Sequence, residues 1–483
     1  MFVETVSPIA TPIVSIWGLG LSQLSLGRCY RRGFGVFAFS WIVGSAALYF
    51  YAQDIPSPAD ADLSYTSEPV PAARNALTRL NESVQSLKYP HDYDEATDRI
   101  DLAIMGAAWD SDWVAKTLDS NAIALERFER AFETDALQIR VVSNYGEQQV
   151  LGGWLMLTKL RALELRRVAL GGEPERALQS LLVLAHFGTR IREIDGGRMI
   201  HYLTGTSVIR VALSAIQSVL KDASVDPELA NQLVRSLDGM RLKRDGWARV
   251  ARGDYQWIKA VLDESVAARE SAGPRVSRDP FARDVLESLL TLAPRWYSLQ
   301  RNRTLARLAG HYRDSMSTSV SSVSSTCAGV RCREEAAPIV QNAPSVYSIE
   351  RNALGNYWAD LAQRSIQIYQ QTGRVSESMV SAVQVMIALR AFEGTRGRMP
   401  AKLDELVPEY LDHVPLDYFD GHAIRYSSDQ HLIYSVGSDL ADAQGQWNPG
   451  ESCHSELSFP IPFATEGRAA AVRSLIICGA SRS

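Results

Sequence analysis

Apolar residues recur at helical spacing through most of the chain between residue 72 and about residue 313. The strongest run is Gln149–Leu170, where Leu151, Trp154, Leu157 and Leu160 recur at intervals of three until Gly171 and Gly172 end the pattern. Pro174 begins the next run, and an Asp-Pro-Glu start signal at 226–228 opens another after Met199–Leu220. This spacing predicts a mostly α-helical protein built from helical hairpins.

Four further helices are expected from the same periodicity. They are Ala72–Leu87, Ala115–Phe132, Ile349–Gln371 and Ser376–Phe392. Between the last two and the earlier helices, Ser315–Ser325 is low in complexity, which indicates an exposed loop over 315–345.

Residues 33–52 contain no charged side chain and have the length of one helical crossing of a bilayer. Arg28, Arg31 and Arg32 precede this segment, whereas the first charged residues after it are acidic. The positive-inside bias therefore predicts a cytoplasmic segment at 1–32 and a large domain outside the cytoplasm. The expected location is the bacterial inner (cytoplasmic) membrane, with a single span and a periplasmic ectodomain.

Other interpretations of this segment stay open. It could be a buried core helix or a cleaved signal peptide, although Phe50-Tyr51-Ala52 is a poor cleavage site. Arg32-Gly33-Phe34 is similar to a prepilin cleavage site, but Ala38 stands where that family carries Glu. Residues 5–27 are also uncharged and could form a second span. The proline-rich stretch that follows, within 53–71, predicts a stiff extended linker leading away from the membrane.

The hydrophobic pattern changes near the C-terminal end. A helix ends near Gly394 and Gly397, and a short apolar segment with Leu403 and Leu406 follows. After Asp420-Gly421 the apolar residues alternate over Ala423–Tyr426 and His431–Tyr434, which predicts the two strands of a hairpin. The sequence thus predicts a small α+β unit at the end of the helical domain.

The stretch from residue 386 to 445 resembles the C-terminal domain of the major pseudopilins of type II secretion. The resemblance is carried by Arg398-Met399-Pro400, by the turn Val414-Pro415-Leu416-Asp417 and by the loop Ser435-Val436-Gly437-Ser438-Asp439. With Asn302-Arg303-Thr304 and Asn352-Ala353-Leu354-Gly355, the whole chain also looks like uncharacterised membrane-anchored helical proteins of Gram-negative bacteria and planctomycetes.

The pseudopilin resemblance implies a calcium site in the loop after the hairpin. Asp439 is the position that carries over, and Asp442 would offer a second carboxylate beside turn carbonyls. The alternative is that both side chains close turns by accepting backbone N–H bonds. This loop is shorter and less acidic than that of the family.

Composition narrows the function classes. A net charge of −5 gives no basic footprint for nucleic acid. Motifs of metalloproteases, serine hydrolases and P-loop proteins are absent, so no catalytic residue is expected. His186 and His201 lie among apolar neighbours and are expected to be hydrogen-bonded structural residues.

Four of the five cysteines follow the predicted span. In an oxidising compartment Cys327 and Cys332 would pair, as would Cys453 and Cys478; free thiols are the alternative.

Together these observations predict seven segments. They are a cytoplasmic segment (1–32), a transmembrane helix (33–52), a linker (53–71), a helical domain (72–314), a Ser-rich loop with a Cys pair (315–345), a long helix with a pseudopilin-like hairpin domain (346–450) and a tail (451–483). The expected function is an interaction or assembly component with an envelope protein partner. An envelope enzyme whose active site is assembled from distant residues and a divergent pseudopilin-like secretion component are the alternatives.

Overall fold

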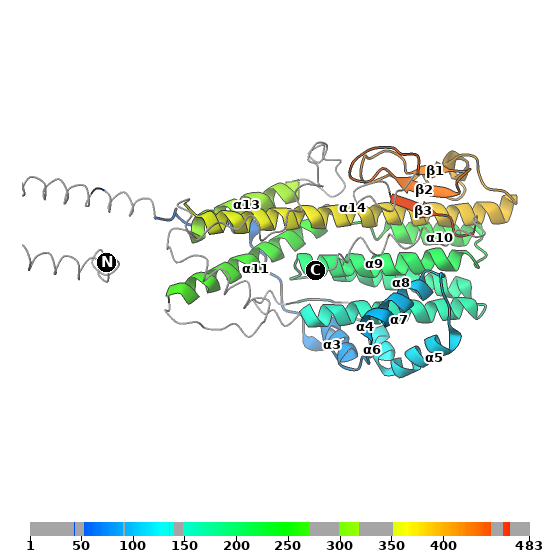
Figure 1. Cartoon of the computed structure of the whole chain (residues 1–483), viewed down its shortest axis with the longest axis horizontal. Helices are drawn as coiled ribbons and strands as arrows, with labels where there is room; N and C mark the ends of the chain where they lie inside the picture. The colour runs from blue at the N-terminus through cyan, green and yellow to red at the C-terminus, as the bar shows by residue number, and fades with distance from the viewer. Residues whose placement is uncertain are drawn as a thin grey trace, which may run out of the picture.

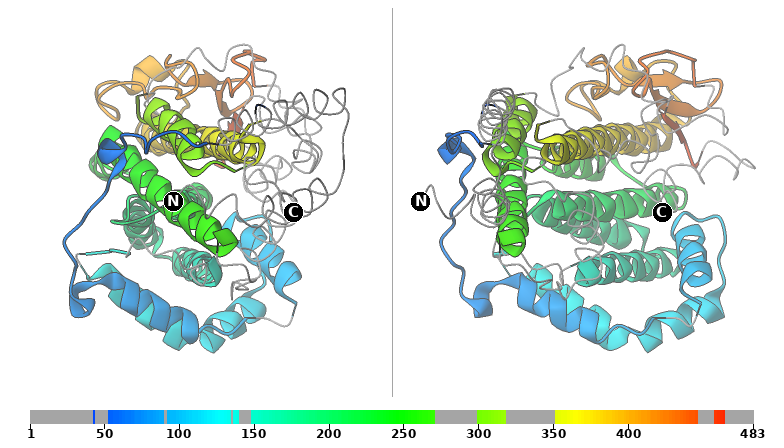
Figure 2. Two further views of the ribbon diagram at one scale, coloured as in Figure 1. Left: turned by 90° about the vertical axis from the view of Figure 1, so that its left-hand side faces the viewer. Right: turned by 60° about the vertical axis from the view of Figure 1, so that its left-hand side comes forward.

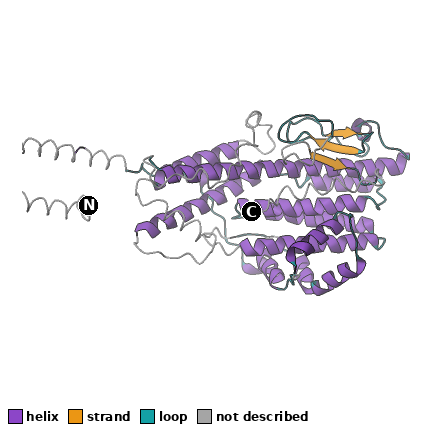
Figure 3. Cartoon of the chain, viewed as in Figure 1, coloured by secondary structure: helices purple, strands orange, loops and turns teal. Residues whose placement is uncertain are grey.

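The computed structural model describes residues 43, 53–89, 92–134, 136–139, 148–270, 299–317, 351–445 and 457–463. This part of the chain is mostly helical, and a three-stranded antiparallel sheet lies near its C-terminal end (Figure 3). The helices of four residues or more are α3 (Ala76–Gln85), α4 (Tyr93–Ile104), α5 (Ser111–Ser120), α6 (Ala122–Phe132), α7 (Gln148–Leu170), α8 (Pro174–Arg192), α9 (Met199–Leu220), α10 (Pro227–Asp238), α11 (Arg244–Glu270), α13 (Arg301–Ser317), α14 (Ala353–Arg396) and the 3-10 helix η6 (Leu403–Leu406). Short 3-10 turns, η1 and η2, lie at Ala61–Leu63 and Ala72–Arg74.

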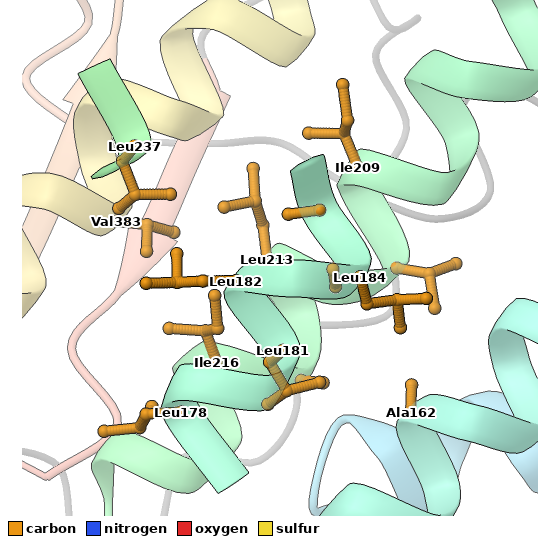
Figure 4. Packing of buried hydrophobic residues seen from close by; sticks show 14 of the residues in the cluster. Ala162, Leu178, Leu181, Leu182, Leu184, Ile209, Leu213, Ile216, Leu237 and Val383 are labelled. Atoms are coloured by element: carbon orange, nitrogen blue, oxygen red, sulfur yellow. The ribbon is translucent and has the colours of Figure 1, made fainter. Parts of the chain in front are cut away.

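The helical pair α8–α9 lies at the centre of the main core. A Cβ at Gly205 of α9 would lie 2.2 Å from the backbone nitrogen of Arg192 in α8, so only glycine permits this close approach. Leucine and isoleucine side chains from both helices meet around Leu181 and Leu213 (Figure 4). The prediction of helical hairpins is confirmed here, with α7, α8 and α9 close to their expected bounds.

The longest element is α14, which runs beside both α9 and α13 (Figure 1). Two separate helices were expected here, with a break between Gln371 and Ser376; that expectation is wrong, because the helix continues through Gly373. One glycine costs a helix only about 1 kcal/mol. Burial of Gly373 and of nearly every residue from Ser376 to Phe392 outweighs that cost.

Two described helices, α9 and α14, are long and apolar enough to cross a membrane by length and composition. Their most apolar windows are 72% and 89% buried inside the fold, respectively. Their apolar surfaces are thus already used by the protein core.

A second, smaller core lies where α11, α13 and the first half of α14 meet. It contains Trp247, Tyr255, Tyr312 and Leu63, the last of which comes from the predicted linker. The segment 53–71 is extended, with a single short turn at η1, and it follows the side of the helical body towards α3 (Figure 2). It is fixed to the body by ion pairs and hydrogen bonds, whose partners were not evident from the sequence.

One other expectation needed correction, and another was confirmed but incomplete. Residues 115–132 belong to two helices, α5 and α6, because Asn121 ends the first. The side-chain oxygen of Asn121 accepts a hydrogen bond from the Lys88 N–H. The expected hairpin forms from β1 (Arg425–Ser427) and β2 (Leu432–Ser435), but a third strand, β3 (Leu457–Pro460), pairs with β2.

Several predicted features fall outside the described residues. They include the predicted transmembrane helix apart from Val43, the Ser-rich loop from residue 318 on, and Cys327, Cys332, Cys453 and Cys478.

Candidate functional site

The C-terminal hairpin unit is organised around a buried carboxylate, Asp417. Its oxygens accept hydrogen bonds from Ser435 Oγ at 2.8 Å, Val436 N at 3.0 Å and Phe419 N at 3.0 Å. Arg425 Nη1 donates a fourth bond at 2.9 Å. The Asp417 side chain is fully buried, and these donors replace the water it has lost. Asp417 thereby joins the turn before the hairpin to β1 and to the end of β2.

Arg425 faces three carboxylates. Besides Asp417 it pairs with Asp420, and its Nε lies 3.3 Å from Asp442 Oδ2. Burial raises the pKa of Asp420, but the hydrogen bonds from Arg425 and from the His422 N–H, together with the nearby positive charge, outweigh this effect and leave the pKa below its usual value. The guanidinium of Arg425 therefore supplies the positive charge around which these three carboxylates are arranged.

Asp439 and Asp442, the residues expected to bind calcium, each close a turn. Asp439 Oδ1 accepts from Ala441 N at 3.1 Å, and Asp442 Oδ1 accepts from Gln444 N at 2.9 Å. The second oxygen of Asp442 is directed to Arg425. Among the described residues, no three His, Cys, Asp or Glu side chains are grouped to hold a metal ion. The geometry matches the turn-closing alternative.

The hairpin unit is seated on the last turns of α14. Ser381 Oγ donates to the carbonyl of Leu416 at 2.8 Å. The rings of Phe392 and Tyr410 meet edge to face at 5.7 Å between centroids. Asn231 of α10 adds a bond to the carbonyl of Glu409 at 3.0 Å. The unit is therefore held in one position by α10 and α14.

A shallow hollow lies on the surface of this unit, with a volume of about 220 Å³. It is lined by Leu403, Val414, Ile424 and Tyr426, and Lys402 and Asp404 add charge to its lining. Leu416, which pairs with Ala423 in this lining, is 49% exposed. The hollow is therefore open, and its lining mixes apolar side chains with polar and charged groups.

A buried ion pair joins α14 to the helical body. Arg192 Nη1 of α8 lies 2.9 Å from Glu377 Oε1, and these side chains are 1% and 2% exposed. Glu377 also accepts the Leu242 N–H at 3.1 Å, and Arg192 donates to the carbonyl of Met240. Arg241 approaches the other oxygen of Glu377 at 3.6 Å. These contacts fix the position of α14 along α8 and the start of α11.

The second core contains a buried carboxyl group, Asp254. It accepts bonds from the Tyr312 hydroxyl and, at 3.1 Å, from Met199 N. Burial raises the pKa of Asp254, against the effect of the bond from Tyr312. Because this group is enclosed by its own partners, it offers no support for the alternative of an enzyme.

The two helical histidines are structural, as expected. His186 Nε2 lies 2.8 Å from Ser236 Oγ, and His201 Nδ1 accepts the Arg198 N–H at 3.0 Å.

Sequence reasoning did not identify Asp417 beyond its place in a turn, nor Arg425, Arg192 or Glu377. A usable signal exists for Glu377, because it is the lone charged residue in the stretch of helix from Val375 to Leu389. A charged side chain in such a stretch is expected to be buried and therefore to have a partner of opposite charge. No comparable signal marks Arg192, whose partner is 185 positions away.

Comparison with known proteins adds no relative. No family model, curated protein or solved structure matches the chain.

Proposed function

We propose that the chain is a membrane-anchored component of the bacterial cell envelope that presents its C-terminal hairpin unit to a protein partner. The observation that carries this proposal is the seating of that unit. Contacts with α14 hold the hollow, with its mixed apolar and charged lining, and the exposed Leu416 in a fixed position. An exposed apolar side chain in a fixed position, such as that of Leu416, gives a partner apolar surface to bury.

The location in the inner membrane, with the helical domain in the periplasm, rests on the uncharged segment 33–52 and on the basic residues before it. Alkaline phosphatase fused after Pro71 is expected to be active, because that enzyme requires export. An inactive phosphatase together with an active cytoplasmic reporter at the same junction would contradict the proposed topology.

The interaction is tested by placing a photo-crosslinking amino acid at Leu416 in intact cells. A defined adduct is expected there. Ile123, which is 64% exposed on α6, is the matched control and is expected to give none. An equal pattern of adducts from both positions, or none from Leu416, would count against the hairpin unit as the interaction surface.

A further inference from the structure

The first described residues after the predicted span are bound to the start of α13. Asp54 accepts hydrogen bonds from the backbone N–H groups of Asn302 and, at 3.0 Å, Arg303. Asn302 Nδ2 in turn donates to the carbonyl of Ile55 at 2.8 Å. A carboxylate at this place also interacts favourably with the positive end of the helix dipole. The chain is therefore attached to the body within two residues of the predicted membrane boundary.

The start of α14 lies at the same place. Asn352, with a positive φ of 58°, accepts from Gln300 N at 2.7 Å and from Thr304 Oγ1 at 3.1 Å. A Cβ at Gly355 would lie 2.0 Å from Thr304 Oγ1, so the two helices approach more closely than any side chain would permit. The starts of α13 and α14 thus form one end of the helical body, visible at the left of Figure 1.

The segment stays attached beyond this point. Asp60 Oδ2 accepts from Tyr255 at 2.8 Å and from Lys259 at 2.6 Å, both on α11. Arg313 of α13 holds both oxygens of Asp62, at 2.8 and 2.7 Å. A bidentate arginine pair restricts direction as well as distance. Residues 53–63 therefore leave no free tether between the predicted membrane span and the helical body.

We propose that the end of the body formed by the starts of α13 and α14 lies against the lipid bilayer surface and holds the protein in one orientation. This inference rests on the proposed membrane anchor. The predicted span ends at residue 52, and the carbonyl of Gln53 already accepts from Gln300 Nε2 at 3.4 Å, so the chain has no slack to let the body move away. The 44 residues of α14 extend about 66 Å. The hairpin unit is thereby held far from the bilayer, where a partner reaches it.

The orientation is measured with the full-length protein in nanodiscs that contain an acceptor dye on the lipid headgroups. A donor dye is introduced through a non-natural amino acid at Ser57, within the attached segment 53–63, or at Asp429, in the exposed turn of the hairpin. Strong energy transfer is expected from Ser57 and close to none from Asp429. Similar transfer from both positions would overturn the proposal, because it would show a body that moves freely on a tether.

Two variants sharpen the test. Asp54→Ala combined with Asp60→Ala removes two attachments and is expected to raise transfer from Asp429 several-fold. Asp112→Ala combined with Asp119→Ala, two exposed residues of α5, is the matched control and is expected to leave it unchanged. A short Gly-Ser insert between Ala52 and Gln53 keeps every contact of residues 53–63 with the body but lengthens the connection to the predicted span. Energy transfer from Ser57 is therefore expected to fall.

An insert that leaves energy transfer from Ser57 unchanged would overturn the proposed orientation on the bilayer, even if the aspartate variants fail to fold. Failure of the membrane anchor is distinguished from failure of the orientation, because an unanchored protein would not enter nanodiscs at all.

Discussion

At the scale of single residues, Asp417 shows how one buried charge holds several loops together. Its carboxylate accepts from Ser435, Val436 and Phe419 and pairs with Arg425, so turn, strand and loop share one acceptor. The sequence placed Asp417 in a turn, but only the fold shows that this turn faces inward.

Asp417→Ala is expected to lower the free energy of unfolding by about 3 kcal/mol or more. The substitution leaves Arg425 without its buried partner and three donors without an acceptor. Asp429→Ala, at an exposed turn position, is the control and should change stability by less than about 0.5 kcal/mol. Chemical denaturation of the purified protein measures both, and equal small effects would show that the Asp417 network contributes little.

Arg425 provides a second prediction, on the calcium site implied by the pseudopilin resemblance. Because Arg425 already pairs with Asp420 and Asp442 and lies between their carboxylates, millimolar calcium is expected to leave the melting temperature of the wild type unchanged. In Arg425→Met the carboxylates repel one another, so calcium is expected to raise the melting temperature of that variant. A calcium-dependent rise in the wild type that Asp439→Ala abolishes would instead support the implied metal site.

At the scale of elements, α14 shows where local patterns mislead. Helical periodicity predicted helices on both sides of Gly373, but as two separate elements, whereas the structure has one continuous helix. The same helix and α9 have the composition of membrane spans, yet their windows are mostly buried in the fold. The strand β3 was missed because its alternation covers only four residues and ends in Pro460, a residue that argues against a strand.

The ion pair that fixes α14 is tested with a double-mutant cycle. Glu377→Leu alone is expected to lower the free energy of unfolding by about 3–5 kcal/mol, because the buried Arg192 loses its close carboxylate partner and keeps only Glu193 at 3.8 Å. Arg192→Met combined with Glu377→Leu is expected to recover much of that loss. The exposed pair Arg176–Glu173 is the control, and Glu173→Gln should change stability by less than about 1 kcal/mol. Additive losses in the double variant would show that the two charges are not coupled.

At the scale of the whole molecule, the segment 53–71 joins the two cores. Leu63 lies in the smaller core beside α11 and α13. Further along, Gln138 accepts the Val70 N–H at 2.7 Å and also binds Asp195 at 2.7 Å, which fixes the segment near the start of α3. Proline content correctly predicted an extended chain, but the contacts that hold it come from residues far away in sequence.

The attachment of this segment is expected to depend on pH. The hydrogen bond from Lys259 lowers the pKa of Asp60 below its ordinary value of 3.8, so the folded state favours the charged form. The stabilisation is therefore complete above pH 3.8 and is lost as pH falls through the lower folded-state value. Asp60→Asn is expected to reduce stability by about 1 kcal/mol at pH 7.

The difference between Asp60→Asn and wild type should shrink as the pH falls below 3.8, the ordinary value for this carboxyl. Thermal melts of both proteins across this range measure it. A difference that stays constant down to the lowest pH would show that the charge of Asp60 is not involved.

The sequence by itself determined the mostly helical class, the bounds of α7, α8 and α9 and the presence of a terminal hairpin. These features depend on the periodicity of neighbouring residues, which any stretch of chain carries within itself. Tertiary structure decided which charges meet and which apolar helices are buried. Arg192 and Glu377 pair across 185 positions, and Asp60 meets Lys259 across 199. No local pattern encodes such pairs, because they form only when packing of the cores brings their helices together.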